Sequence, residues 1–158
     1  MIRQIVALDR NRGIAKDGVQ PWKLSIDEQY FTDQTKLYDA VVLMGRRTYE
    51  TIGRPLSGRQ NFVLSRDKSF EAAGATVVHD IDVFLATHPS VWIIGGRELY
   101  DQTLGRADEL YITEIYQDYD CDVQYPNYKD SFELVQSSDC IREQGVDYYF
   151  KIYKPSSI

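Results

Sequence analysis

The sequence predicts an α/β protein with a mostly parallel sheet, helices on both faces and an antiparallel edge near its C-terminus. Strand-like and helix-like segments alternate through the first hundred residues, whereas the remaining segments are strands only. The run at 91–94 (VWII) is apolar throughout, which is typical of a strand covered on both faces. The 158 residues contain no repeat, low-complexity tract or linker, so one domain, 1–158, is expected.

The N-terminal part is predicted to hold a strand, a loop and a helix. Residues 2–8 (IRQIVAL) are mostly apolar and of strand length. A loop that contains two glycines follows. Ser25 and Glu28, three residues apart, match a capping box, so a helix is expected from Ile26 to about Lys36.

Short apolar runs bounded by glycine, proline or polar residues supply the other strands. These runs are 39–44, 60–64, 75–78, 91–94 and 109–115. Three short helices are expected between them, at 47–52, 81–87 and 98–104. The last two runs, 132–137 and 147–153, flank a polar loop that contains glycine, and they predict a closing antiparallel hairpin.

The distribution of charge excludes one class of function and favours another. A formal net charge of −6 argues against general nucleic-acid binding. Residues 46–66 hold five arginines, no lysine and a single acid. An arginine-only segment favours an anionic small ligand held by planar guanidinium groups, and the alternative is a solvated basic surface.

Signals for membranes, export and metals are missing from the sequence. No apolar run reaches the roughly 20 residues that span a bilayer, and the N-terminus has no signal-peptide pattern, so no membrane partner is expected. Cys121 and Cys140 lack motif spacing, which favours a reduced, cytoplasmic compartment, although a disulfide between them stays open. His79 and His88 form no ligand cluster, so no metal site is expected.

Three of the expected strands end in residues suited to phosphate binding. Gly45-Arg46-Arg47-Thr48 follows one strand at a helix start, where free N–H groups and the helix dipole favour an anion. Ser65-Arg66 follows a second strand, and Gly95-Gly96 follows a third. Because the carboxyl ends of strands in an open α/β sheet share one edge, these segments outline a pyrophosphate site and a separate phosphate site. This pattern indicates NADP rather than NAD, and without a GxGxxG fingerprint it is not the ordinary dinucleotide fold.

Asp27 is the candidate acid. It lies in the first turn of the expected helix, near Trp22 and one turn from Phe31. A carboxylate beside aromatic rings is partly desolvated, which raises its pKa and lets it hold a proton or bind a cationic ring. The alternative is an acid that only complements the helix dipole.

In their order along the chain, these motifs resemble dihydrofolate reductase over nearly the whole sequence. The matching segments are Ile5-Val6-Ala7, Pro21-Trp22, Asp27 with Phe31, 44–56 (MGRRTYETIGRPL), Gly58-Arg59, 64–66 (LSR), 94–96 (IGG) with Tyr100, 111–113 (YIT) and 122–126. The resemblance implies an eight-stranded sheet with about four helices. It also implies NADPH-dependent reduction of 7,8-dihydrofolate to 5,6,7,8-tetrahydrofolate, in support of one-carbon metabolism and thymidylate and purine synthesis.

The resemblance also assigns roles to the matched residues. Asp27 would bind the 2-amino group and N3 of the pterin with help from Thr113, and Trp22 would hold a water near that acid. Hydride would pass to C6, and N5 would be protonated. Substrate contacts would come from Ile5, Val6, Asp27, Glu28, Phe31, Ile52, Arg54, Leu56, Arg59, Ile94 and Thr113. Among these, Arg59 would clamp the α-carboxylate of the glutamate tail.

The cofactor implied by the resemblance is NADPH. Its contacts would come from Ala7, Ile14, Gly45, Arg46, Arg47, Thr48, Leu64, Ser65, Arg66, Ile94, Gly95, Gly96, Arg97, Leu99 and Tyr100. Arg46, Ser65 and Arg66 would select the 2′-phosphate, and a cis peptide would join Gly95 to Gly96. One small domain without an obvious apolar stripe further predicts a monomer whose partner is a small-molecule substrate.

Several positions depart from the family pattern and leave alternatives open. Ala15 replaces a usual glycine and Gln20 a usual apolar residue. Arg97 follows the glycine pair, where it either reaches the pyrophosphate or points to solvent. Glu28 replaces an apolar residue that faces the substrate, so it either caps the helix or lines the pocket. The competing functions are a related NADPH reductase of a pyrimidine or flavin precursor and a catalytically inactive nucleotide-binding protein.

Overall fold

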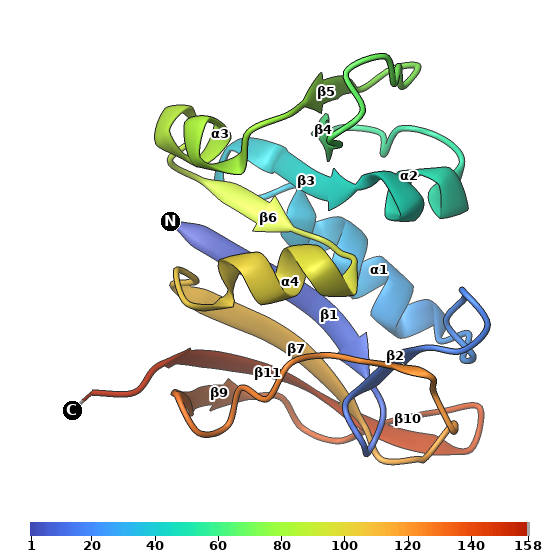
Figure 1. The fold of residues 1–158 in the computed structure, drawn as a ribbon. Coiled ribbons are helices and arrows are strands. Elements are labelled where there is room, and N and C mark those ends of the chain that lie inside the picture. The colour runs from blue at the N-terminus through green and yellow to red at the C-terminus, as the bar shows by residue number, and fades with distance from the viewer. Residues whose placement is uncertain (158) are drawn as a thin grey trace.

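A mixed β-sheet forms the centre of the computed structural model, which describes residues 1–157 (Figure 1). The strands are β1 (Ile2–Leu8), β2 (Gly13–Ala15), β3 (Val41–Gly45), β4 (Gln60–Leu64), β5 (Thr76–Val78), β6 (Val91–Ile93), β7 (Glu109–Ile115), β8 (Val123–Gln124), β9 (Phe132–Ser137), β10 (Ile141–Glu143) and β11 (Val146–Pro155). The helices are α1 (Ser25–Thr35), α2 (Arg46–Ile52), α3 (Ile81–Thr87) and α4 (Arg97–Leu104), with a 3-10 turn, η1 (Tyr38–Ala40). The predicted elements are therefore present, most of them within one or two residues of their expected ends.

Eight strands lie in the order β10-β11-β7-β1-β6-β3-β4-β5. The pairs from β7 through β1, β6, β3 and β4 to β5 are parallel, and β11 joins β7 antiparallel. A further strand, β9, pairs with the C-terminal part of β11 on the edge that β10 occupies near its start. The predicted α/β class, the mostly parallel sheet and the antiparallel C-terminal edge are confirmed.

The four helices cover the two faces of this sheet in pairs. Side chains of α3 and α4 pack with Val6 of β1, whereas side chains of α1 and α2 pack with its neighbour Ile5. Successive strand residues point to opposite faces, so this alternation sends the two neighbours into different cores. In Figure 1, α4 lies in front of β1 and α1 lies behind it.

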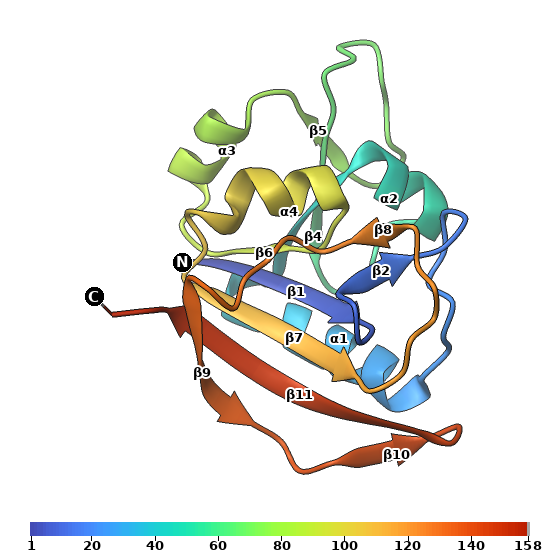
Figure 2. The ribbon, with the colours of Figure 1, turned by 60° about the horizontal axis from the view of Figure 1, so that its bottom comes forward.

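The C-terminal edge differs in detail from the expected hairpin. The two predicted strands do pair, as β9 and β11, but β10 lies between them in sequence and makes the tight turn with β11. That turn uses Gln144 and Gly145, both at positive φ (53° and 74°), as a two-residue turn that follows the twist of the strands requires. Two short strands that were not expected, β2 and β8, pair beside the end of β1 (Figure 2).

The predicted capping box at the start of α1 is wrong. The helix begins at Ser25, one residue earlier than expected, and no side-chain hydrogen bond between Ser25 and Glu28 caps it. The backbone N–H groups of Ser25 and Ile26 instead donate to the carboxylate of Glu143, at 2.7 and 3.1 Å. A carboxylate from a distant strand has therefore replaced the local cap, because it accepts from two N–H groups that a helix start leaves unpaired.

Candidate active site

A cavity of about 1260 Å³ crosses the carboxyl-end edge of the sheet. Its walls come from β1, the loop up to Gln20, α1, the β3–α2 junction, the segment after β4, the segment from Ile94 into α4, and β7. It therefore joins the expected acid to the three expected phosphate segments in one continuous space.

Asp27 and Thr113 form the acid end of the cavity. The Thr113 hydroxyl on β7 donates to Oδ1 of Asp27 on α1 at 2.7 Å. Burial raises the pKa of Asp27 to about 6, against the opposing effect of the Thr113 hydrogen bond, and the negative charges of Glu28 and Glu143 raise it further. A carboxyl with this pKa is able to take up or hold a proton near neutral pH.

Trp22, five residues before Asp27, does not line the cavity. Its ring is buried among apolar side chains and packs against Tyr119 with 5.2 Å between ring centroids. Its Nε1 is buried and has no hydrogen-bond partner within residues 1–157. An indole N–H in that situation is a donor able to hold a bound water or ligand atom.

The wall next to Asp27 is mainly apolar. Of the residues expected to contact substrate, those that line the cavity are Ile5, Val6, Asp27, Glu28, Phe31, Ile52, Ile94 and Thr113. Glu28 is exposed on this wall, so of its two predicted roles only a place in the pocket remains. Sequence reasoning missed Tyr30, which also lines the cavity and stacks on Phe150 at 3.8 Å between centroids.

The other three expected substrate residues, Arg54, Leu56 and Arg59, do not line the cavity. Leu56 packs against the core on the α1 side of the sheet. Arg59 donates from Nε to the Ser57 carbonyl and from a terminal nitrogen to Thr35 Oγ1, both at 3.0 Å. Burial lowers the pKa of Arg59, and the charge of Arg54 lowers it further, so the two guanidinium groups lie near each other at the C-terminal end of α1.

Gly95 and Gly96 line the cavity where the backbone leaves little room for a side chain. A cis peptide joins them, and Gly95 has a φ of 126°, a conformation that side-chain-bearing residues rarely adopt. A Cβ on either glycine would lie 3.4 Å from Thr48 Oγ1. The Gly95 carbonyl accepts from Gly45 N at 2.8 Å, which holds two of the predicted phosphate segments together.

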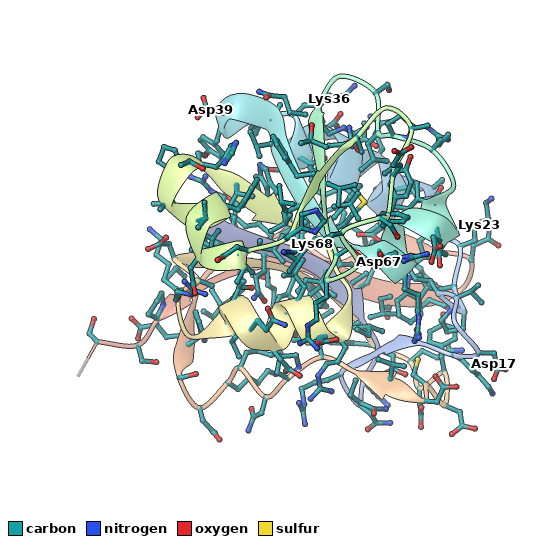
Figure 3. All side chains as sticks on the ribbon, turned by 45° about the horizontal axis from the view of Figure 1, so that its top comes forward. Asp17, Lys23, Lys36, Asp39, Asp67 and Lys68 are labelled. Atoms are coloured by element: carbon teal, nitrogen blue, oxygen red, sulfur yellow. The ribbon has the colours of Figure 1, made fainter. Side chains whose placement is uncertain are left out.

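Arginines at the far end of the cavity are held by carboxylates. Arg46 contacts Glu50 at 3.4 Å and Asp67 at 3.2 Å, and its guanidinium lies 4.2 Å above the Phe70 ring. Figure 3 shows Asp67 on the loop that follows β4. Arg66 contacts Glu98 at 3.3 Å, and both side chains are exposed. This end of the cavity is thus rich in guanidinium groups. Their ion pairs with exposed carboxylates are weak, so a ligand phosphate would replace the carboxylates as their partner.

The remaining expected cofactor residues also line the cavity. They are Ala7, Ile14, Gly45, Arg47, Thr48, Leu64, Ser65, Ile94, Arg97, Leu99 and Tyr100. Arg97 donates to Asp101 at 2.7 Å and to the Gln124 carbonyl. Tyr100 donates from its hydroxyl to the Ile5 carbonyl at 2.7 Å, which ties α4 to β1. The cavity is also lined by residues that the sequence did not single out as contacts, among them Thr51, Asp122 and Gln20. The sequence placed Thr51 in a helix, Asp122 in a segment that matches the family and Gln20 in a loop.

Neither a metal site nor a membrane-spanning helix is found in the described residues. Among residues 1–157, no three His, Cys, Asp or Glu side chains gather as a metal site would require. None of the helices in that range is long and apolar enough to cross a membrane.

Comparison with known proteins gives a consistent result. The model of the dihydrofolate reductase family matches residues 1–155. Dihydrofolate reductase of Bacillus subtilis (strain 168) is 37% identical over 98% of this chain and 94% of its own length. The enzyme of Staphylococcus haemolyticus is 33% identical over 97% and 95%. Dihydrofolate reductase from Enterococcus faecalis, solved with NADP(H) and RAB-propyl, superimposes with a TM-score of 0.89 at 27% identity, over 99% of this chain and 97% of that one.

Proposed function

The chain belongs to the dihydrofolate reductase family and is an NADPH-dependent oxidoreductase that reduces dihydrofolate, and we propose that Asp27 is the acid on which this reaction depends. The observation that carries the proposal is the cavity itself. One end holds the Asp27 carboxyl, which has a pKa of about 6 and accepts a hydrogen bond from Thr113, and the other end holds Arg46 and Arg66. One carboxyl able to hold a proton near neutral pH suits a reaction that adds one hydride and one proton to its substrate.

On the substrate side, Asp27 binds the 2-amino group and N3 of the pterin. The Thr113 hydroxyl keeps the carboxyl of Asp27 turned toward the cavity. The unpaired Trp22 Nε1 holds a water beside this acid, through which a proton reaches N5. Ile5 and Phe31 pack on the ring and limit the access of bulk water, which keeps the pKa of the acid high.

Beyond the pterin, the benzoyl group and glutamate tail extend along α1. Ile52 and Leu56 offer apolar contacts there, and Arg59 clamps the α-carboxylate of the tail. Thr35 and Ser57 hold the Arg59 guanidinium at one end of the helix, with Arg54 as a second positive charge nearby. A planar guanidinium binds a carboxylate with two parallel hydrogen bonds, which gives this end its specificity.

On the cofactor side, the residues present suit NADPH. Any side chain at Gly95 or Gly96 would approach Thr48, so the wall there lets a flat or extended group come close to the backbone. Gly45 and Thr48 offer N–H and hydroxyl donors to the pyrophosphate, and Arg46, Ser65 and Arg66 select the 2′-phosphate. When bound, the cofactor supplies the hydride that is transferred to C6 of the pterin.

The assay for this proposal is the loss of NADPH absorbance after dihydrofolate is added to the purified protein. Wild-type protein is expected to turn over, and Asp27→Asn is expected to lose about two orders of magnitude in kcat/KM at neutral pH while binding NADPH normally. Absence of turnover in the wild type would overturn the function. Full activity of Asp27→Asn would overturn the role of the acid.

We further propose that residues 1–158 act as one domain, as a monomer and in the cytoplasm. The strands of the central sheet and one family match extend over nearly the whole chain, which supports a single domain. Cys121 and Cys140 are free thiols, which supports a reducing compartment. Light scattering coupled to gel filtration is expected to give a mass near 18.3 kDa, and twice that mass would contradict the monomer.

A further inference from the structure

The carboxylate of Glu143 connects the C-terminal hairpin to the start of α1. Its Oε2 accepts from the backbone N of Ser25 at 2.7 Å and from the Ser25 hydroxyl at 2.5 Å. Its Oε1 accepts from Ile26 N at 3.1 Å and from the Tyr148 hydroxyl on β11 at 2.7 Å. One side chain therefore receives four donors from the helix and from its own hairpin.

This contact is the side-chain cap of α1 in the described part of the chain. Leu24 occupies the N-cap position and has no side-chain oxygen, and the expected pair of Ser25 and Glu28 does not form. The N–H groups that Glu143 accepts belong to the two residues directly before Asp27. The position of the first turn, and with it the direction in which the Asp27 side chain leaves the helix, is thus set from β10.

We propose that Glu143 is a positioning residue for the reduction of dihydrofolate: by capping α1 from the β10–β11 hairpin, it holds Asp27 in reach of Thr113 and of the pterin. The proposal rests on the function proposed above for Asp27. It gives the C-terminal hairpin, which contributes no residue to the cavity wall, a part in the reaction.

The charge of Glu143 acts on Asp27 as well. Hydrogen bonds from Ser25 and Tyr148 lower the pKa of Glu143 to about 2, so this carboxylate is ionised at neutral pH. The titratable groups that interact with Asp27 are Glu28 and Tyr30 on its own helix, Glu143 on β10 and Tyr148 on β11. Of these, the two glutamates raise the pKa of Asp27 beyond the effect of burial, and removal of the Glu143 charge is expected to lower it.

Three variants separate positioning from general stability. Glu143→Ala removes the cap and the charge, Glu143→Gln removes the charge but keeps an oxygen for one helix N–H, and Asp147→Asn is the matched control. Asp147 is a carboxylate of the same hairpin that pairs with Arg142 at 2.8 Å and makes no side-chain hydrogen bond or ion pair with α1 within residues 1–157. All three variants keep the hairpin, with the same length and a similar exposed surface.

For Glu143→Ala we expect the KM for dihydrofolate to rise several-fold with the KM for NADPH unchanged, and amide hydrogen exchange at residues 26–28 to speed up. For Glu143→Gln we expect a smaller rise in KM and a fall of a few tenths of a unit in the apparent pKa of the pH–kcat profile, because one negative charge has left the surroundings of Asp27. Asp147→Asn is expected to match the wild type in all of these measurements.

The results also distinguish failure of this proposal from failure of the function. Unchanged KM for dihydrofolate and unchanged exchange at residues 26–28 in an active Glu143→Ala enzyme would overturn the role of Glu143 alone. Equal changes in both KM values would indicate a purely structural role and would overturn it as well. Wild-type protein without turnover would overturn the proposed function, and the role of Glu143 in it. If Glu143→Ala does not fold, the pH profile and KM values of Glu143→Gln decide.

Discussion

The Thr113 hydroxyl donates to Oδ1 of Asp27 at 2.7 Å, although 86 residues separate the two in sequence. Parallel pairing with β1 brings this part of β7 to the centre of the sheet, and α1 crosses the same face of the sheet. The hydrogen bond stabilises the charged form of the acid and thus limits how far burial raises its pKa.

Thr113→Val is expected to lower kcat/KM for dihydrofolate about tenfold. The substitution keeps the shape of the side chain but removes the donor to Asp27, so the acid loses its orientation and its pKa rises above about 6. Steady-state kinetics across a pH series measures both effects. Thr113→Ser, which retains the hydroxyl, is the control and is expected to stay close to the wild type. An unchanged pH profile in Thr113→Val would contradict the role of this hydrogen bond.

Stability is expected to depend on pH through Asp27. Its pKa is raised from 3.8 in the unfolded chain to about 6 in the fold, so the folded protein binds this proton more tightly. The resulting stabilisation is complete below about pH 4 and is lost as the pH rises through about 6. Asp27→Asn, which cannot ionise, is therefore expected to gain stability relative to the wild type across this window and to keep a constant difference above it. Urea unfolding at several pH values measures this difference, and a difference that does not vary with pH would rule out a raised pKa.

Glu28→Leu is expected to strengthen the binding of lipophilic diaminopyrimidine antifolates about three- to tenfold, with a smaller effect on dihydrofolate. Glu28 is an exposed carboxylate on an otherwise mainly apolar wall, and an apolar ligand that covers it must displace its water. Because Glu28 takes no part in a capping box, its replacement leaves the start of α1 capped by Glu143. The measurement is the inhibition constant of such an antifolate for each protein. Equal values for the wild type and Glu28→Leu would show that the charge of Glu28 does not affect the binding of these ligands.

Arg66→Ala is expected to raise the KM for NADPH about tenfold and to leave the KM for NADH nearly unchanged. The Arg66 side chain is exposed on the cavity wall and, within residues 1–157, its ion-pair partner is the exposed Glu98, so its loss removes the proposed phosphate contact at little structural cost. Arg106→Ala is a suitable control because Arg106 also forms an exposed ion pair, with Asp82, but lies away from the cavity. A parallel loss of both cofactors in Arg66→Ala would indicate that Arg66 does not read the 2′-phosphate.

Local patterns in the sequence predict most of the elements and the residues that line the two ends of the cavity. Apolar runs such as 91–94 became buried strands because a strand covered on both faces needs apolar residues at every position. Gly45-Arg46 and Gly95-Gly96 are predicted ligand segments because glycine and arginine at a strand end carry their chemistry locally, and both segments line the same cavity. The short strands β2, β8 and β10 were missed, since two or three residues contain too little pattern to detect.

Only the tertiary structure decided which distant groups meet. The local pattern offered Ser25 and Glu28 as a helix cap, yet Glu143, 118 residues from Ser25, accepts from Ser25, Ile26 and Tyr148 together. Arg59 likewise finds Thr35 only because the chain returns to the end of α1. A sequence motif specifies which atoms are able to donate or accept, whereas the choice among possible partners depends on the distances that strand order and helix packing impose. The sequence by itself therefore determined the chemistry that Asp27 is able to perform, and the fold decided the partners, Thr113 and Glu143, that orient it and shift its pKa.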